Sequence, residues 1–248
     1  MALAQFPSVS NQQRRAARCV VLLLALLPVL PAIANTLLIW PVSMVFTPDQ
    51  RTQELWLENR SENPVSLQIR VFEWKQVDGA EDYQPQPMLL ASPPFSNIGG
   101  GKKQLIRLVR VQPGDANREY QFRVIIDEVP RKDDKNQSGV QFQMRYSVPV
   151  FFQNGAMPKE PAIYFEENLS YVVADHKLRI TNNGAFSARI ARLSTVDKAK
   201  QPVYLTQGLL GYVLPGSTME WAFDHGIEAG VLSAEVNGEE VRLHPGKP

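Results

Sequence analysis

The sequence predicts an all-β protein with two β-sandwich domains in series, preceded by a segment of a different kind. Apolar and polar residues alternate in many short stretches separated by turn residues, which is the pattern of half-buried strands. Residues 35–154 contain no convincing helical periodicity. Gly155, Pro158 and Pro161 follow one another closely and indicate the boundary between the two domains.

The segment 1–34 is typical of a secretory signal peptide. Three arginines, the last of them Arg18, precede the apolar run "CVVLLLALLPVLPAIA", which ends in a small-x-small pattern at Ala34. These are the parts of an export signal, and the run is short for a membrane span, which needs about 20 residues. We expect removal of 1–34 and a periplasmic location, with an uncleaved anchor as the alternative.

Removal of residues 1–34 would change the composition in two ways. Cys19 is the only cysteine, so the mature chain could form no disulfide and would depend on its apolar core. Three of 26 basic residues would be lost, leaving 23 against 25 acidic residues, or −2 instead of +1. A charge so near zero argues against a nucleic-acid partner bound through phosphate neutralisation.

The first domain is predicted at residues 35–154. Its short strands and regular turns indicate an immunoglobulin-like sandwich, although the cysteine pattern of antibody domains is missing. "GAEDYQPQP" is predicted to be a polar connection and "RKDDKNQSG" a loop. The stretches with strand periodicity include "TLLIWPVSMVF", "TQELWLENRS", "PVSLQIRVFEW", "KKQLIRLVRV", "REYQFRVIIDEVP" and "VQFQMRYSVPVFF".

The second domain is predicted at residues 155–248 and is also strand-rich. Strand periodicity occurs in "LSYVVADHKLRITNNGAFSARIARLSTV", "PVYLTQGLLGYVLPGSTMEWAF" and "AGVLSAEVNGEEVRLH". Asn182-Asn183-Gly184 and Asn237-Gly238 are hairpin signals. A β-sandwich is therefore expected here too.

The last strand of the first domain, Val140–Phe152, is unusual for its length and pattern. Its apolar residues recur at every second position, and Pro149, which cannot donate a backbone hydrogen bond, indicates a sheet edge. A long apolar edge strand is normally an aggregation hazard. An ordinary core strand of a sandwich would explain the alternation as well.

An enzyme is not predicted. The histidines His176, His225 and His244 lack metal-ligand spacing, and no nucleophile elbow, P-loop or metalloprotease motif is present. "IGGGKK" lacks a following helix and is better explained as a turn. We therefore predict no catalytic residue, no metal, no cofactor and no small-molecule substrate.

The order of several motifs resembles the PapD-like periplasmic chaperones of chaperone–usher pili. The resemblance covers nearly the whole mature chain and is strongest from Pro93 to Phe152. It is based on the pair Pro93-Pro94, the segment Gly101–Arg107, the strand end Glu128-Val129-Pro130 and the alternating strand that follows. It implies a chaperone that binds pilus subunits between two immunoglobulin-like domains and delivers them to an outer-membrane usher.

The resemblance also explains the long edge strand. Such chaperones insert alternating apolar side chains of this strand into a subunit that lacks a strand of its own, which is donor-strand complementation. The side chains expected to fill the groove of the subunit are Val140, Phe142, Met144, Tyr146 and Val148.

The sequence departs from the best-known branch at the site that anchors the C-terminal carboxylate of the subunit. That branch uses an arginine and a lysine, where this chain has Ser43 and Pro149. The divergent archaic branch also lacks the pair, and it is the expected branch here. Arg123 is the predicted replacement anchor, and the reserves are Arg107, Arg110 and Arg145. Each arginine is also compatible with an ordinary solvated strand position.

Two further expectations concern partners and alternatives. The free protein is a candidate for self-association through its exposed strand. The alternative function is an exported structural or adhesive β-sandwich protein of a pilus, although the two-domain length and the absence of cysteines in the mature chain disfavour it.

Overall fold

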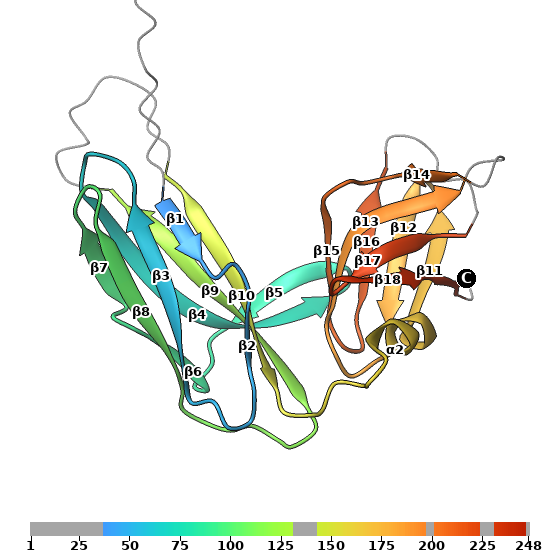
Figure 1. Ribbon diagram of the computed structural model, residues 1–248, viewed down its shortest axis with the longest axis horizontal. Helices are drawn as coiled ribbons and strands as arrows, with labels where there is room; N and C mark the ends of the chain where they lie inside the picture. The colour runs from blue at the N-terminus through green and yellow to red at the C-terminus, as the bar shows by residue number, and fades with distance from the viewer. Residues whose placement is uncertain (1–36, 131–142, 197–200, 224–230, 247–248) are drawn as a thin grey trace, which may run out of the picture. The chain divides into compact units, whose positions relative to one another are not determined.

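The structure is a computed structural model that describes residues 37–130, 143–196, 201–223 and 231–246. The predicted signal peptide lies outside these residues, as do Val140 and Phe142. Residues 36–248 cluster as one compact unit. Figure 1 shows that they form two sheet-rich domains, which confirms the predicted fold class.

The first domain contains two sheets. One has the strand order β1-β3-β8-β6 and the other has the order β2-β10-β9-β4-β5, with β7 paired to β4. The strands of the first sheet are β1 (Leu37–Trp40), β3 (Thr52–Asn59), β8 (Lys103–Arg110) and β6 (Leu89–Ser92). Those of the second are β2 (Met44–Phe46), β10 (Arg145–Gln153), β9 (Glu119–Val129), β4 (Val65–Val77), β5 (Ala80–Gln84) and β7 (Phe95–Ile98).

The two sheets of the first domain enclose one apolar core. Because side chains alternate across a strand, every second residue of a core strand points inward. Leu55 and Leu57 of β3 meet Phe122, Val124 and Ile126 of β9 in this core, and all five side chains are fully buried. The alternation in the sequence therefore identified the inward faces.

The second domain also contains two sheets, with the orders β16-β12-β11-β19 and β14-β13-β17-β18, and β15 pairs with β13. Its strands are β11 (Leu169–Ala174), β12 (Lys177–Asn182), β13 (Ala188–Val196), β14 (Pro202–Tyr204), β15 (Leu209–Val213), β16 (Thr218–Ala222), β17 (Ser233–Val236), β18 (Glu239–Arg242) and β19 (His244–Pro245). The helix α2 (Pro161–Asn168) precedes them and was not predicted. Proline is tolerated in the first turn of a helix, and Phe165 anchors this helix in the core.

One hairpin prediction is confirmed and another is wrong. Asn237-Gly238 links β17 to β18 in a two-residue turn, and both residues have positive φ, as this turn requires. Asn182-Asn183-Gly184 instead joins strands of different sheets, since β12 pairs with β11 and β16. The Asn182 side chain is buried and donates to the carbonyl oxygens of Phe186 and Val213.

A second correction concerns "GAEDYQPQP", which was predicted to be a connection. Residues Ala80–Gln84 form β5, which pairs with the end of β4 across the turn Asp78-Gly79. Both turn residues have positive φ. Gly79 also makes an isolated bridge to Met219 of β16, so the β4–β5 hairpin extends to the second domain (Figure 1).

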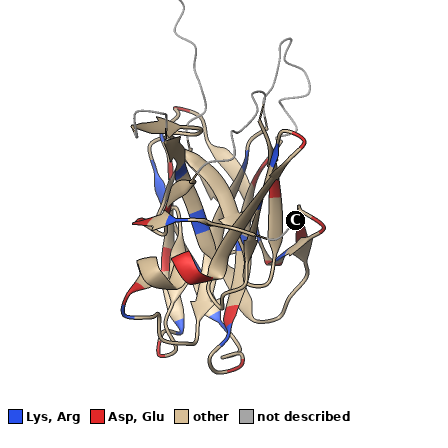
Figure 2. Ribbon diagram, turned by 90° about the vertical axis from the view of Figure 1, so that its right-hand side faces the viewer, with Lys and Arg blue, Asp and Glu red and all other residues tan. Residues whose placement is uncertain are grey.

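Charges of both signs occur along the described strands. In the view of Figure 2, lysine and arginine positions are interspersed with aspartate and glutamate positions. Among the described residues, no group of three or more histidine, cysteine or acidic side chains is arranged to hold a metal ion. No helix in this part of the chain has the length and apolar character needed to span a bilayer.

Candidate binding site

Arg123 is a buried cation on the face of β9 that points away from the core. Its neighbours Phe122 and Val124 point into the core, so the Arg123 side chain lies on the opposite face of the sheet. Pro149 of β10 and Phe72 of β4 are its partners across the two adjacent strands. Although this face is the outer one, Arg123 is only 8% exposed.

Aromatic rings account for this burial. The guanidinium carbon of Arg123 lies 3.7 Å from the ring centroid of Trp74 and 5.3 Å from that of Tyr212. Trp74, Phe151, Tyr212 and Leu214 form a separate apolar cluster that we call the aromatic cluster. A desolvated cation–π contact contributes about 2 kcal/mol, so the rings compensate part of the loss of hydration of Arg123.

The hydrogen-bonding capacity of this site is largely unused within the described residues. Arg123 Nη2 lies 3.4 Å from Glu81 Oε1, while the buried Nε atom has no partner. The indole nitrogen of Trp74 is also buried without a partner. Leaving buried donors unpaired is unfavourable, so the site is suited to a ligand that accepts hydrogen bonds and carries negative charge, such as a carboxylate.

The β4–β5 hairpin supplies the acidic partner. Glu81 and Tyr83 of β5 lie opposite Gln76 and Trp74 of β4, and the Tyr83 hydroxyl donates to Glu81 Oε2. Burial, together with the hydrogen bond to Glu81, raises the pKa of Tyr83 to about 12. Tyr83 is therefore a protonated donor at neutral pH that orients the Glu81 carboxylate.

Gln76 attaches the hairpin to β15 and the residue after it. Gln76 Nε2 donates to the carbonyl oxygen of Tyr212 at 2.8 Å, and the N–H of Leu214 donates to Gln76 Oε1 at 2.8 Å. This reciprocal pair of bonds fixes Tyr212 beside Arg123. The site is therefore formed by segments more than 130 residues apart in sequence.

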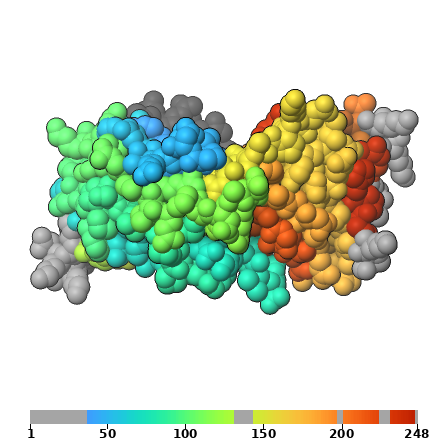
Figure 3. Space-filling model, turned by 90° about the horizontal axis from the view of Figure 1, so that it is seen from below, coloured from blue at the N-terminus to red at the C-terminus, as the bar shows by residue number. Residues whose placement is uncertain are grey.

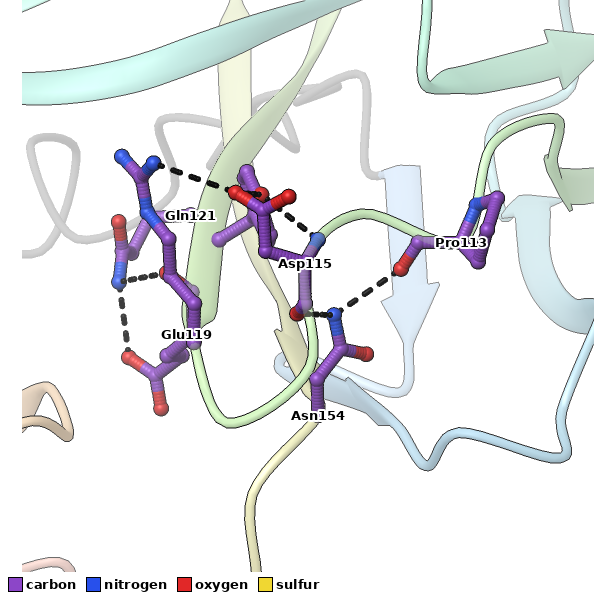
Figure 4. A network of polar contacts seen from close by, with 7 residues as sticks. Pro113, Asp115, Glu119, Gln121 and Asn154 are labelled. Carbon is purple, nitrogen blue, oxygen red and sulfur yellow. Dashed lines mark hydrogen bonds and ion pairs between the residues drawn. The ribbon is translucent and has the colours of Figure 1, made fainter.

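A second contact between the domains begins at Glu119, the first residue of β9. Its Oε1 atom accepts hydrogen bonds from the backbone N–H and the hydroxyl of Ser187. The same oxygen accepts from Gln121 Nε2 (Figure 4). Burial raises the pKa of the Glu119 carboxyl, although these hydrogen bonds act in the opposite direction. A cavity of about 400 Å³ adjoins this contact, and its lining includes Ser43, Phe151, Arg189 and Tyr212.

The loops around this contact are held by Asn154. Its side-chain nitrogen donates to the carbonyl oxygens of Pro113 and Asp115 at 2.9 and 2.8 Å (Figure 4). In the space-filling view, the segments near residues 115 (light green) and 155 (yellow) lie side by side (Figure 3). Asn154 therefore fixes the segment that leads from β10 into the second domain.

The three reserve arginines lie elsewhere. Arg110 is buried, bonds to the carbonyl oxygens of Thr47 and Pro113 and lies over the ring of Phe152, which is a structural role. Arg107 is exposed on β8, in the other sheet. Arg145 is exposed and forms an ion pair with Asp127 at 2.5 Å. The structure thus brings only Arg123 of these four into the aromatic cluster.

The side chains predicted to enter a partner's groove fall into different environments. Met144 precedes β10 and is 45% exposed, Tyr146 packs partly against the core, and Val148 is 4% exposed within it. The prediction for Val148 therefore conflicts with its position, because this side chain fills the core of its own domain. Val140 and Phe142 lie outside the described residues.

The start of β10 has one open edge. The strand pairs with β9 over its whole length, but with β2 only through Val150–Phe152. Within the described part of the chain, residues 145–149 have no strand on the side away from β9. Such an edge is able to accept an additional strand from another chain.

The sequence singled out Arg123 as a candidate anchor, which stays a prediction, but gave no sign of its surroundings. Trp74 was part of a predicted strand, and Tyr212 and Glu81 were given no role. The Asp78-Gly79 dipeptide between two polar stretches is a hairpin signal that could have revealed β5. No local signal places Tyr212 beside Arg123, because that proximity depends on the contact between the domains.

Comparisons with known proteins agree with the fold. Residues 37–157 match the model of the family described as pili and flagellar-assembly chaperone, PapD N-terminal domain. The probable fimbrial chaperone YadV of Escherichia coli K12 is 28% identical over 152 residues, which cover 56% of this chain. The match spans 59% of the length of that relative, which is less than two thirds.

Solved structures extend the similarity to both domains. A chain in the crystal structure of the CsuC–CsuE chaperone–tip adhesion subunit pre-assembly complex, from archaic chaperone–usher Csu pili of Acinetobacter baumannii, is 27% identical. The similarity covers 86% of this chain and 100% of that one, with a TM-score of 0.66. The crystal structure of the CupB2 chaperone of Pseudomonas aeruginosa is 21% identical, with a TM-score of 0.59. That similarity covers 84% of this chain and 100% of the CupB2 chain, and it shows the fold alone. The protein thus has the two-domain immunoglobulin-like fold of chaperone–usher chaperones, and its residues 37–157 match the PapD N-terminal domain family.

Proposed function

We propose that this protein is a non-catalytic periplasmic chaperone that binds pilus subunits and delivers them to an outer-membrane usher. The observation that carries this proposal is the buried Arg123 with unpaired donors around it, on the sheet that also has the open edge of β10. The family match of residues 37–157 and the similarity to a chain from a chaperone–subunit complex support it.

The open edge supports binding by donor-strand complementation. An incoming subunit strand can pair with the backbone of residues 145–149, while the apolar side chains before them enter its groove. Of the side chains in this role, Met144 is exposed and Tyr146 is half-buried. Val140 and Phe142 retain this role as a proposal, whereas Val148 is assigned to the core.

Arg123 is proposed to anchor the C-terminal carboxylate of the subunit. A carboxylate removed from water needs a cation and hydrogen-bond donors, and the guanidinium of Arg123 with the indole N–H of Trp74 provides both. Ser43 and Pro149 supply no charge at the positions used by the best-known branch. The shift of the cation to β9 is consistent with the archaic branch.

Release is proposed to follow strand exchange with the next subunit at the usher. The sequence has no P-loop, and replacement of one strand by another requires no nucleotide. Self-association of the free protein through the edge of β10 is a further part of the proposal.

A periplasmic pull-down tests the function. The tagged protein is expressed together with candidate pilus-subunit genes of its own genome. Bound proteins are identified by mass spectrometry for wild type, Arg123→Ala and Arg179→Ala. Arg179 is an exposed arginine of the second domain, paired with Glu220, and serves as the matched control. We expect a small β-rich subunit with wild type and the control, and its loss with Arg123→Ala. No subunit in any sample would contradict the chaperone function, and retention by Arg123→Ala would contradict the anchor.

A further inference from the structure

The β4–β5 hairpin brings a carboxylate of the protein itself to the cation that is proposed to bind the subunit. Glu81 and Arg123 are 42 residues apart in sequence, and they meet because Glu81 and Tyr83 project from the same face of β5, with Trp74 opposite Tyr83. Among the described residues, Glu81 is the only acidic side chain paired with Arg123.

The contact is weak for a pair of this kind. Arg123 Nη2 and Glu81 Oε1 are 3.4 Å apart, whereas charge-assisted hydrogen bonds are normally about 2.7 to 2.9 Å long. Only one of the two carboxylate oxygens faces Arg123, because the other accepts from Tyr83. The Glu81 side chain is also 35% exposed, so it can leave the site and become hydrated.

We propose that Glu81 is an internal competitor for Arg123 that the C-terminal carboxylate of the subunit displaces. This inference rests on the proposed anchor function of Arg123. A ligand carboxylate can accept from both Arg123 and the unpaired donors, which Glu81 at its observed distance does not do. Two carboxylates beside one guanidinium repel each other, so binding of the ligand moves Glu81 away.

Competition of this kind changes both affinity and specificity. In the free protein, Glu81 compensates a buried positive charge that would otherwise be unpaired. On binding, the ligand must replace an existing ion pair, so the observed affinity is lower than the intrinsic affinity of Arg123. When the subunit departs, Glu81 returns and favours release. Glu81 therefore favours ligands whose carboxylate makes better contacts with Arg123 than the Glu81 carboxylate does.

The test uses a matched pair of peptides and the full mature chain. An alternating apolar hexapeptide is prepared with a free C-terminal carboxylate and with a C-terminal amide. Its binding is followed through the indole N–H signal of Trp74 in NMR titrations. The variants are Glu81→Gln, Arg123→Ala and Asp82→Asn. Asp82 carries the same charge as Glu81. It lies between Glu81 and Tyr83 on β5, so its side chain points to the other face of the strand.

We expect wild type to bind the acid more tightly than the amide, and Arg123→Ala to abolish the difference. Glu81→Gln is expected to increase affinity for the acid about fivefold, the effect of removing a partly exposed ion pair, and to leave the amide unchanged. Asp82→Asn should resemble wild type. Unfolding midpoints of all variants verify that each is folded.

The outcomes separate the two claims. An acid preference that depends on Arg123 but is unchanged in Glu81→Gln would overturn the competition by Glu81 and leave the anchor intact. An acid preference that appears only in Glu81→Gln would support the inference in its strongest form. No preference in any variant would overturn the anchor, and the inference with it.

Discussion

The guanidinium of Arg123 lies 3.7 Å from the ring centroid of Trp74, and the buried Nε atom of each side chain has no hydrogen-bond partner within the described residues. Stacking stabilises the cation, but it does not satisfy the donors, since a ring face accepts only weakly. The pair therefore forms a preorganised site with unused hydrogen-bonding capacity.

Trp74→Phe should weaken subunit binding while the fold is preserved. Phenylalanine keeps an aromatic ring in the cluster with Phe151 and Tyr212 but lacks the indole N–H. Loss of one hydrogen bond to a charged acceptor corresponds to a decrease in affinity of about tenfold or more. Subunit affinity is measured with purified complexes. Trp56→Phe, on β3 of the other sheet, is the control, and equal affinities for the two variants would contradict a role for the Trp74 N–H.

Met144→Asp and Val148→Ala should separate binding from stability. Met144 is exposed, so aspartate there should abolish subunit retention and change the free energy of unfolding by less than about 0.5 kcal/mol. Val148 is buried in the core, so alanine should lower this free energy by about 2 kcal/mol. Denaturant unfolding and pull-downs measure the two effects. Full subunit retention by Met144→Asp would contradict the proposed donor role.

Gln76→Ala should loosen the attachment of the hairpin. The substitution removes two hydrogen bonds and leaves the Leu214 N–H and the Tyr212 carbonyl without this partner. We expect a loss of about 1 to 3 kcal/mol in stability and faster amide hydrogen exchange at Leu214. Gln84→Ala, an exposed position of the same hairpin, should leave this exchange unchanged. Unaltered protection of Leu214 in Gln76→Ala would show that the bond is unimportant.

The pH dependence of stability should reveal the buried Glu119. Because burial raises its pKa, the folded protein binds this proton more readily than the unfolded chain does. The resulting contribution is fully present below the ordinary glutamate pKa of about 4.3 and is lost as the pH rises through the raised value. Glu119→Gln should therefore gain stability relative to wild type as the pH is raised from about 4 to about 8.

Glu220 provides a control of opposite sign for this experiment. Hydrogen bonds from Lys177 and Arg179 lower the pKa of the Glu220 carboxyl, so its contribution is present above the ordinary value and is lost as the pH falls. Glu220→Gln should lose stability relative to wild type as the pH rises. Thermal unfolding midpoints across the pH range measure both variants. Parallel curves for wild type and Glu119→Gln would contradict the account of Glu119.

The periodicity of the sequence was sufficient to predict the sheets but not the limits of their cores. Apolar residues alternate without interruption from Val140 to Val150, so the pattern contains no sign that Val148 is in the core while Met144 is exposed. That distinction depends on the tertiary packing, because the side chains that share the core with Val148 come from other strands. The helix α2 was missed because its proline-rich approach resembles a linker.

The surroundings of Arg123 in the candidate binding site were only partly predictable for a related reason. Side chains alternate along β9, so Arg123 points to the face away from the core, which Phe122 and Val124 enter. This alternation can be read from the sequence. Its burial cannot, because Trp74, Glu81 and Tyr212 reach it from other strands. Residues joined by tertiary contacts leave no local pattern in a single sequence.

A crystal structure of this protein with a co-purified pilus subunit would test the Arg123 anchor most directly. We expect the C-terminal carboxylate of the subunit to lie about 2.7 to 2.9 Å from the Arg123 guanidinium, with Glu81 displaced from its observed position. A carboxylate bound at Arg145 or beside Ser43, with Arg123 still paired to Glu81, would contradict the account.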